Sequence, residues 1–60
     1  DTTAIFRTLY DNASQYIAKR SIPQLVMFLA KYQYQAAFVA DHEINLTACL
    51  TEMMIDLEFV

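Results

Sequence analysis

The sequence predicts an all-α fold of three helices in a single small domain that spans residues 1–60. Three observations predict it. The chain has no glycine and one proline, so it lacks most of the turn chemistry of β-hairpins. Apolar residues recur with the helical period, and alternation of period two never lasts for a whole strand. Half of the residues are hydrophobic even without the four tyrosines, which is too apolar for a disordered chain.

The first helix is expected over about residues 3–20. Its apolar side chains fall within an arc of roughly 140° on a helical wheel, and polar side chains fill the rest. Thr2 or Thr3 can cap its start, and Arg7 and Asp11 are spaced for an i,i+4 ion pair. The apolar arc, which we expect to cover the core, consists of Ile5, Phe6, Leu9, Tyr10, Ala13, Tyr16 and Ile17.

The second helix is expected over about residues 22–41. Ser21 with Gln24 three positions later matches a capping box. Pro23 is tolerated in a first turn because its missing N–H would be unpaired there anyway, although it can shift the helix start by one residue. The connection to the first helix is short, so the two helices should pack as neighbours.

This second helix has two apolar faces, separated by a narrow polar stripe. A helix that is apolar nearly all round is buried nearly all round. Two short helices cannot surround it, so we expect it to be central and its second face to meet another copy, in a homodimeric helical bundle. The core face is Leu25, Phe28, Leu29, Tyr32, Ala36 and Val39. The predicted self-association face is Val26, Met27, Ala30, Tyr34, Ala37 and Phe38, with Ala37 expected at the middle of the contact.

The polar segment 41–45 is expected to form the second turn, since Asp and Asn tolerate the left-handed conformation that a glycine-free turn can need. A third helix should follow over about residues 46–59, with Asn45 as its N-cap and Thr47 as the alternative. Its main apolar arc is Leu46, Cys49, Leu50, Met53, Met54, Leu57 and Val60, and a weaker stripe is Ala48, Ile55 and Phe59.

Charge is distributed unevenly along the chain, whose net charge is −3. The first 31 residues have four cations and two acids (+2), and the remaining 29 have five acids and no cation (−5). Opposite charges of this kind can attract each other within one fold or across two subunits.

Glu52 and Asp56 form a like-charge i,i+4 pair on the third helix, for which Lys19 and Arg20 are the candidate counter-ions. We favour a solvated face or an internal ion pair at this position. The alternative is a partner-binding edge for a protein with a basic patch, made of Glu52, Asp56, Ile55 and Phe59.

Catalytic and metal-binding chemistry has little support. His42 and Cys49 are the only soft ligands, whereas zinc sites recruit three or four. A nucleophile needs an adjacent base, and Cys49 lies on a core arc. Phosphate-binding loops need glycines, and there are none. We therefore expect no enzyme, no metal and no cofactor.

These observations favour a small non-enzymatic regulator or adaptor that acts as a helical homodimer and binds another protein. The alternative is a dimerisation or docking domain excised from a longer protein, which the missing initial Met and the apolar end suggest. A DNA-binding helix-turn-helix is a distant third, because no helix has a basic face for phosphates.

Targeting signals are not recognisable in the sequence, which has neither a secretory signal nor an apolar run of membrane-spanning length. The lone thiol favours a reducing compartment. We therefore expect a cytoplasmic protein with neither a membrane nor a nucleic acid as partner.

Overall fold

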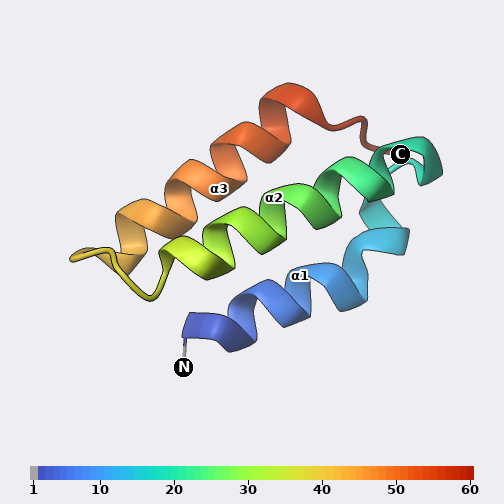
Figure 1. The fold of residues 1–60 in the computed structure, drawn as a ribbon. Coiled ribbons are helices and arrows are strands. Elements are labelled where there is room, and N and C mark those ends of the chain that lie inside the picture. Colours follow the sequence, from blue (N-terminus) through green and yellow to red (C-terminus); the bar gives the residue numbers. More distant parts are fainter. Residues whose placement is uncertain (1) are drawn as a thin grey trace.

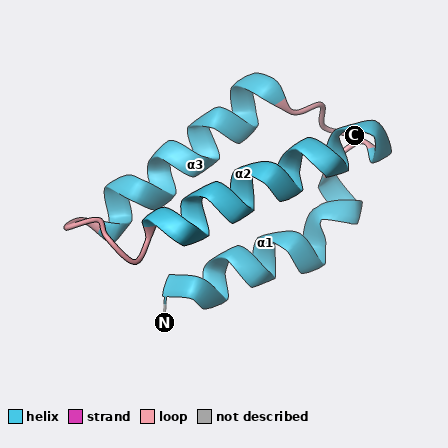
Figure 2. Cartoon of the chain, in the orientation of Figure 1, coloured by secondary structure: helices cyan, strands magenta, loops and turns pink. Residues whose placement is uncertain are grey.

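The computed structural model describes residues 2–60, with side chains from residue 4 onwards. The chain forms α1 (Thr2–Tyr16), a single 3-10 turn η1 (Lys19–Ser21), α2 (Ile22–Gln35) and α3 (His42–Asp56). Helix α2 lies between α1 and α3 and packs against both (Figure 1). No strand occurs within residues 2–60, which are helices joined by short loops (Figure 2). The predicted all-α fold of three helices is confirmed. The predicted caps at Thr2 and Thr3 lie outside the described side chains.

Helix α1 ends at Tyr16, earlier than the predicted end near residue 20. The backbone at Ala18 is extended (φ −58°, ψ 141°) because this segment pairs with the C-terminal tail. The Ala18 N–H donates to the Glu58 carbonyl at 2.8 Å, and the Val60 N–H donates to the Tyr16 carbonyl at 2.9 Å. These tertiary bonds satisfy the backbone groups in place of a further helical turn.

Helix α2 begins where the sequence predicts, with Pro23 in its first turn. Ser21 occupies the N-cap position, but its side chain makes no capping hydrogen bond. Its Oγ instead accepts the Glu58 N–H at 3.0 Å, so the predicted capping box does not form. The helix ends at Gln35 rather than near residue 41, and the next three residues form a turn.

The start of α3 is set by Asp41. Its Oδ1 accepts the N–H groups of Glu43 and Ile44 at 3.0 and 3.1 Å, which makes Asp41 the N-cap. The predicted caps, Asn45 and Thr47, were therefore wrong, and both lie inside the helix. The second turn covers residues 36–41 rather than the predicted 41–45, and it uses no left-handed residue, since no residue of 2–60 has a positive φ.

The core lies on the side of α2 that the sequence predicts. Leu25 is fully buried, and the partly buried Phe28 packs on the edge of the core. Three residues assigned to the core arc of α3 are exposed: Leu50 by 38%, Met54 by 73% and Val60 by 82%. Met54 lies about 100° round the helix from the buried Met53, and Val60 lies in the tail beyond the helix end. The buried apolar residues are Phe6, Ala13, Ile17, Leu25, Leu29, Tyr32, Ala36, Cys49, Met53 and Leu57.

Candidate functional site

Large apolar side chains are more numerous on the surface of this chain than in its core. Among residues 4–60, thirteen such side chains are exposed, whereas the core contains only seven large ones beside two alanines and a cysteine. Scattered exposed apolar residues are ordinary, but contiguous ones mark a surface that binds a partner. The candidate site is therefore the surface on which these side chains gather.

One such surface is the outer side of α2, opposite its core face. Met27 and Tyr34 are each 70% exposed and Phe38 is 72% exposed. The rings of Tyr34 and Phe38 pack against each other with their centroids 5.1 Å apart. Ala30 is exposed between Met27 and Tyr34. We call Met27, Ala30, Tyr34 and Phe38 the α2 ridge.

The α2 ridge contains most of the face that the sequence predicts for self-association, and that whole face is exposed. Val26, at its margin, is 41% exposed. Ala37 cannot be at the middle of the face as predicted, because the helix ends at Gln35 and Ala37 lies in the following turn. The middle of the face is instead Ala30 and Tyr34.

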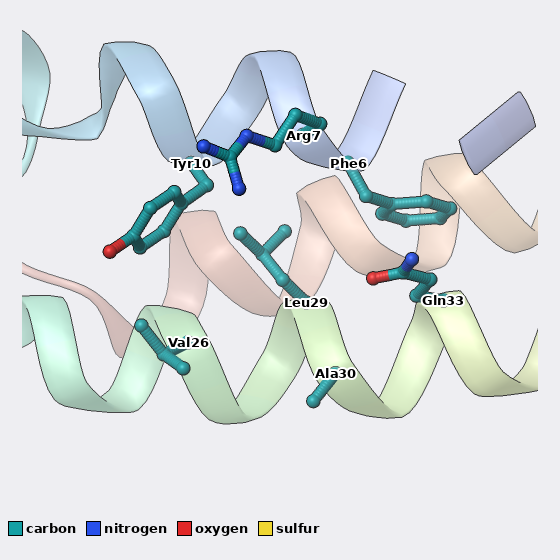
Figure 3. A pocket seen from close by; sticks show the side chains of 7 residues that line it. All are labelled: Phe6, Arg7, Tyr10, Val26, Leu29, Ala30 and Gln33. Atoms are coloured by element: carbon teal, nitrogen blue, oxygen red, sulfur yellow. The ribbon is translucent and has the colours of Figure 1, made fainter. Parts of the chain in front are cut away.

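A groove of about 410 Å³ lies beside the ridge, between α1 and α2 (Figure 3). Phe6 and Leu29 form its buried apolar floor. The Arg7 guanidinium lies 5.5 Å from the Tyr10 ring centre and forms the predicted ion pair with Asp11 at 3.1 Å. An apolar floor with a polar rim suits the side chain of a partner that is apolar with a polar end. The complete lining is Phe6, Arg7, Tyr10, Val26, Leu29, Ala30 and Gln33.

A second groove, of about 520 Å³, lies between α1 and α3; we call it the α1–α3 groove. Its floor includes the buried Ala13 and Met53, and Leu50 and Phe59 stand at its edge with 38% and 48% exposure. None of its lining residues is charged at neutral pH. The lining is Thr8, Leu9, Asn12, Ala13, Tyr16, Ile17, Leu50, Met53 and Phe59.

The structure does not gather the four residues of the predicted acidic edge. Phe59 lines the α1–α3 groove, whereas Glu52 lines a different hollow, between α2 and α3. Ile55 is 75% exposed and Asp56 is exposed at the end of α3. These residues therefore belong to separate surfaces.

Two ion pairs join the basic and acidic halves of the chain. Lys31 pairs with Glu52 at 3.0 Å, and Arg20 forms a bidentate ion pair with the carboxylate of Glu58. Hydrogen bonding by Arg20 lowers the pKa of Glu58 from its ordinary value. The expected internal ion pair at Glu52 is confirmed, but the cation is Lys31 rather than Lys19 or Arg20.

The two soft ligands of the sequence lie in different environments. Cys49 is fully buried, and burial raises the pKa of its thiol to about 11, which disfavours the reactive thiolate. His42 is exposed as the first residue of α3. Within residues 2–60, no three His, Cys, Asp or Glu side chains are grouped as metal ligands would be.

Comparison with known proteins finds no matching family model, no matching curated protein and no matching solved structure. Across the part of the chain that the structure describes, no helix combines the length and the apolar composition that crossing a bilayer requires.

Proposed function

We propose that this protein is a small non-enzymatic interaction module, a regulator or adaptor that associates with itself through the outer face of α2 and binds another protein. The observation that carries the proposal is the exposure of the α2 ridge. Tyr, Met and Phe are enriched at protein–protein interfaces, and large exposed apolar patches are rare on monomers. A chain of this size is also only marginally stable alone, so a partner subunit would stabilise it.

The apolar area of the two aromatic rings of the ridge would stabilise association, but the stabilisation is only comparable to the free-energy cost of associating. An aromatic side chain buries about 150–250 Å², so two rings at about 70% exposure would remove roughly 200–350 Å² from water. At about 25 cal/mol per Å² this contributes about 5–9 kcal/mol, against an association cost of about 4–15 kcal/mol. The contact therefore needs Met27 and further residues beside the two rings.

The chemistry of the remaining groups supports binding rather than catalysis. The one thiol is buried with a raised pKa, so it is poorly suited to act as a nucleophile. Three of the four cations, Arg7, Arg20 and Lys31, are paired with acids within the chain, which weakens the DNA-binding alternative. A buried lone thiol also suits the reducing cytoplasm, where we place the protein.

A dimerisation or docking domain of a longer protein is the second candidate. The same ridge favours it, because the contact would be identical and only the flanking sequence would differ.

The test compares two glutamate substitutions on α2. Tyr34→Glu places a charge in the middle of the ridge, and Gln24→Glu places the same charge at an exposed position off it. Sedimentation velocity from about 1 to 200 μM should show the parent and Gln24→Glu gaining mass with concentration, while Tyr34→Glu remains a single chain. A burial of unpaired charge at a contact costs several kcal/mol, which is enough to abolish weak association.

Two outcomes would count against the proposal. If Tyr34→Glu associates as well as Gln24→Glu, the contact lies on another face. If the parent itself remains a single chain throughout, self-association is wrong.

A further inference from the structure

We propose that the α2 ridge of one copy seats in the α1–α3 groove of a second copy, so that copies join head to tail. This inference rests on the proposed self-association and specifies which surface receives the ridge. The dimensions of the groove, its lack of charge and the area that a stable contact needs all favour this arrangement.

The shape of the α1–α3 groove suits the binding of one helix. Its walls are two helices, and its floor is the apolar surface around Ala13 and Met53. From Thr8 to Tyr16 the α1 wall is about 12 Å long, or a little over two helical turns. A helix laid along it would place its apolar face against the groove floor, as in helix-in-groove recognition, and would add a fourth helix to the three.

The α2 ridge of the same chain is a helix face whose dimensions match the groove. Met27 and Tyr34 lie two turns apart, about 10 Å, on one side of α2. The Phe38 ring extends the ridge by packing on Tyr34. The part of the ridge from Met27 to Tyr34 is one helix wide and fits within the length of the groove.

The absence of charge on both surfaces supports the match. No ridge residue is charged, and the α1–α3 groove is lined without charge. All three ion pairs of the described chain lie among residues outside that lining. Seating the ridge would therefore bury no unpaired ion, which is the costliest defect of an interface. Thr8 and Asn12 at the groove offer hydrogen-bonding groups to the Tyr34 hydroxyl, which usually has a partner when buried.

The area of contact favours ridge in groove over ridge on ridge. A stable interface buries about 800 Å² on each partner. Two convex ridges touch only where they cross, and the two rings of one ridge contribute no more than roughly 350 Å². A groove with two walls encloses the ridge and adds the exposed parts of Tyr16, Leu50 and Phe59.

The direction of assembly follows from where the two surfaces lie. The ridge lies on the side of α2 opposite Leu25 and Leu29, which belong to the core. The α1–α3 groove lies on the far side of that core, so the two surfaces face in different directions. One pair of copies therefore cannot exchange both contacts. Such a heterologous interface repeats from copy to copy and produces a ring or an open chain.

A mixing experiment tests the inference. Tyr34→Glu changes the ridge and leaves the groove intact, and Leu50→Glu changes the groove and leaves the ridge intact. Thr51→Glu, on α3 outside the groove lining, is the matched control. In sedimentation velocity, each of the first two variants alone should be a single chain, and their equimolar mixture should form a 1:1 dimer that cannot grow. Thr51→Glu should assemble like the parent, beyond the dimer at high concentration.

The other outcomes separate this inference from the proposed function. If Leu50→Glu alone assembles like the parent while Tyr34→Glu does not, the ridge binds a surface other than this groove and only the inference fails. A mixture that remains single chains also overturns the inference. A parent that never associates overturns both proposals. Circular dichroism checks folding, and Thr8→Glu, at an exposed position of the groove, replaces Leu50→Glu if that variant unfolds.

Discussion

Ser21 holds the C-terminal tail on the connection between α1 and α2, and Ser21→Ala should destabilise the fold by about 1–3 kcal/mol. The side chain is 8% exposed, and its Oγ accepts the Glu58 N–H at 3.0 Å. Alanine removes the acceptor and leaves a partly buried donor without a partner, which is the costly way to lose a hydrogen bond. The whole stability of a 60-residue domain is about 3–9 kcal/mol, so the loss should be large in proportion.

The ion pair between Arg20 and Glu58 reaches the same tail and provides the comparison. Both side chains are largely exposed, by 76% and 51%, so water and salt screen the pair. Arg20→Gln should therefore cost less than Ser21→Ala. Urea unfolding followed by far-UV circular dichroism measures both, at one protein concentration because association shifts the apparent stability. If Arg20→Gln costs as much as Ser21→Ala, the tail is held by charge and the reasoning is wrong.

Three further predictions concern the core and the titrating groups. Leu25→Ala should lower the free energy of unfolding by about 3–5 kcal/mol, and Met54→Ala by about 0.5 kcal/mol or less, as measured by thermal unfolding. Equal losses for the two variants would contradict the core assignment. Burial raises the pKa of Cys49 from 9.0 to about 11, so its stabilising contribution, complete below pH 9, should be lost as pH rises towards 11. In urea unfolding measured at a series of pH values, Cys49→Ala should lack the part of the loss in stability above pH 9 that comes from the Cys49 thiol. The pKa of Glu58 is lowered by Arg20, so its contribution should be complete above the ordinary carboxyl pKa and lost as pH falls through the lowered value; Glu58→Gln should lack this acid-dependent loss.

The α2 helix shows how much of the fold the sequence contains. Its two faces are separable by helical periodicity alone, and the predicted core face is the buried one. The prediction worked because the face is continuous over three turns and contains large residues such as Leu25 and Leu29. The outer face was also identifiable, since apolar residues such as Met27 remained after the core face was assigned.

Helix ends were less predictable because they depend on contacts between distant residues. Asp41 and Asn45 are equally good cap residues by type. The structure uses Asp41 as the cap, and Asn45 is buried with its Nδ2 donating to the Tyr32 carbonyl at 3.3 Å. The end of α1 likewise depends on the pairing of Ala18 with Glu58, forty residues away in sequence. Neither contact has a local signal.

The α1–α3 groove had no sequence signal at all. Helical periodicity places Leu50 and Phe59 on different stripes of the third helix, and it gives the polar residues Thr8 and Asn12 no distinguishing feature. The groove exists because α1 and α3 both pack on α2 and leave a channel between them. Such a feature depends on the angles between helices, which helical periodicity does not specify.

The most direct test of the central claim is the solution mass of the unmodified chain. Sedimentation equilibrium near physiological salt, over about 1–300 μM, should give a weight-average mass that rises with concentration above the 6.9 kDa of one chain. A mass that stays at 6.9 kDa over the whole range would contradict self-association through the α2 ridge.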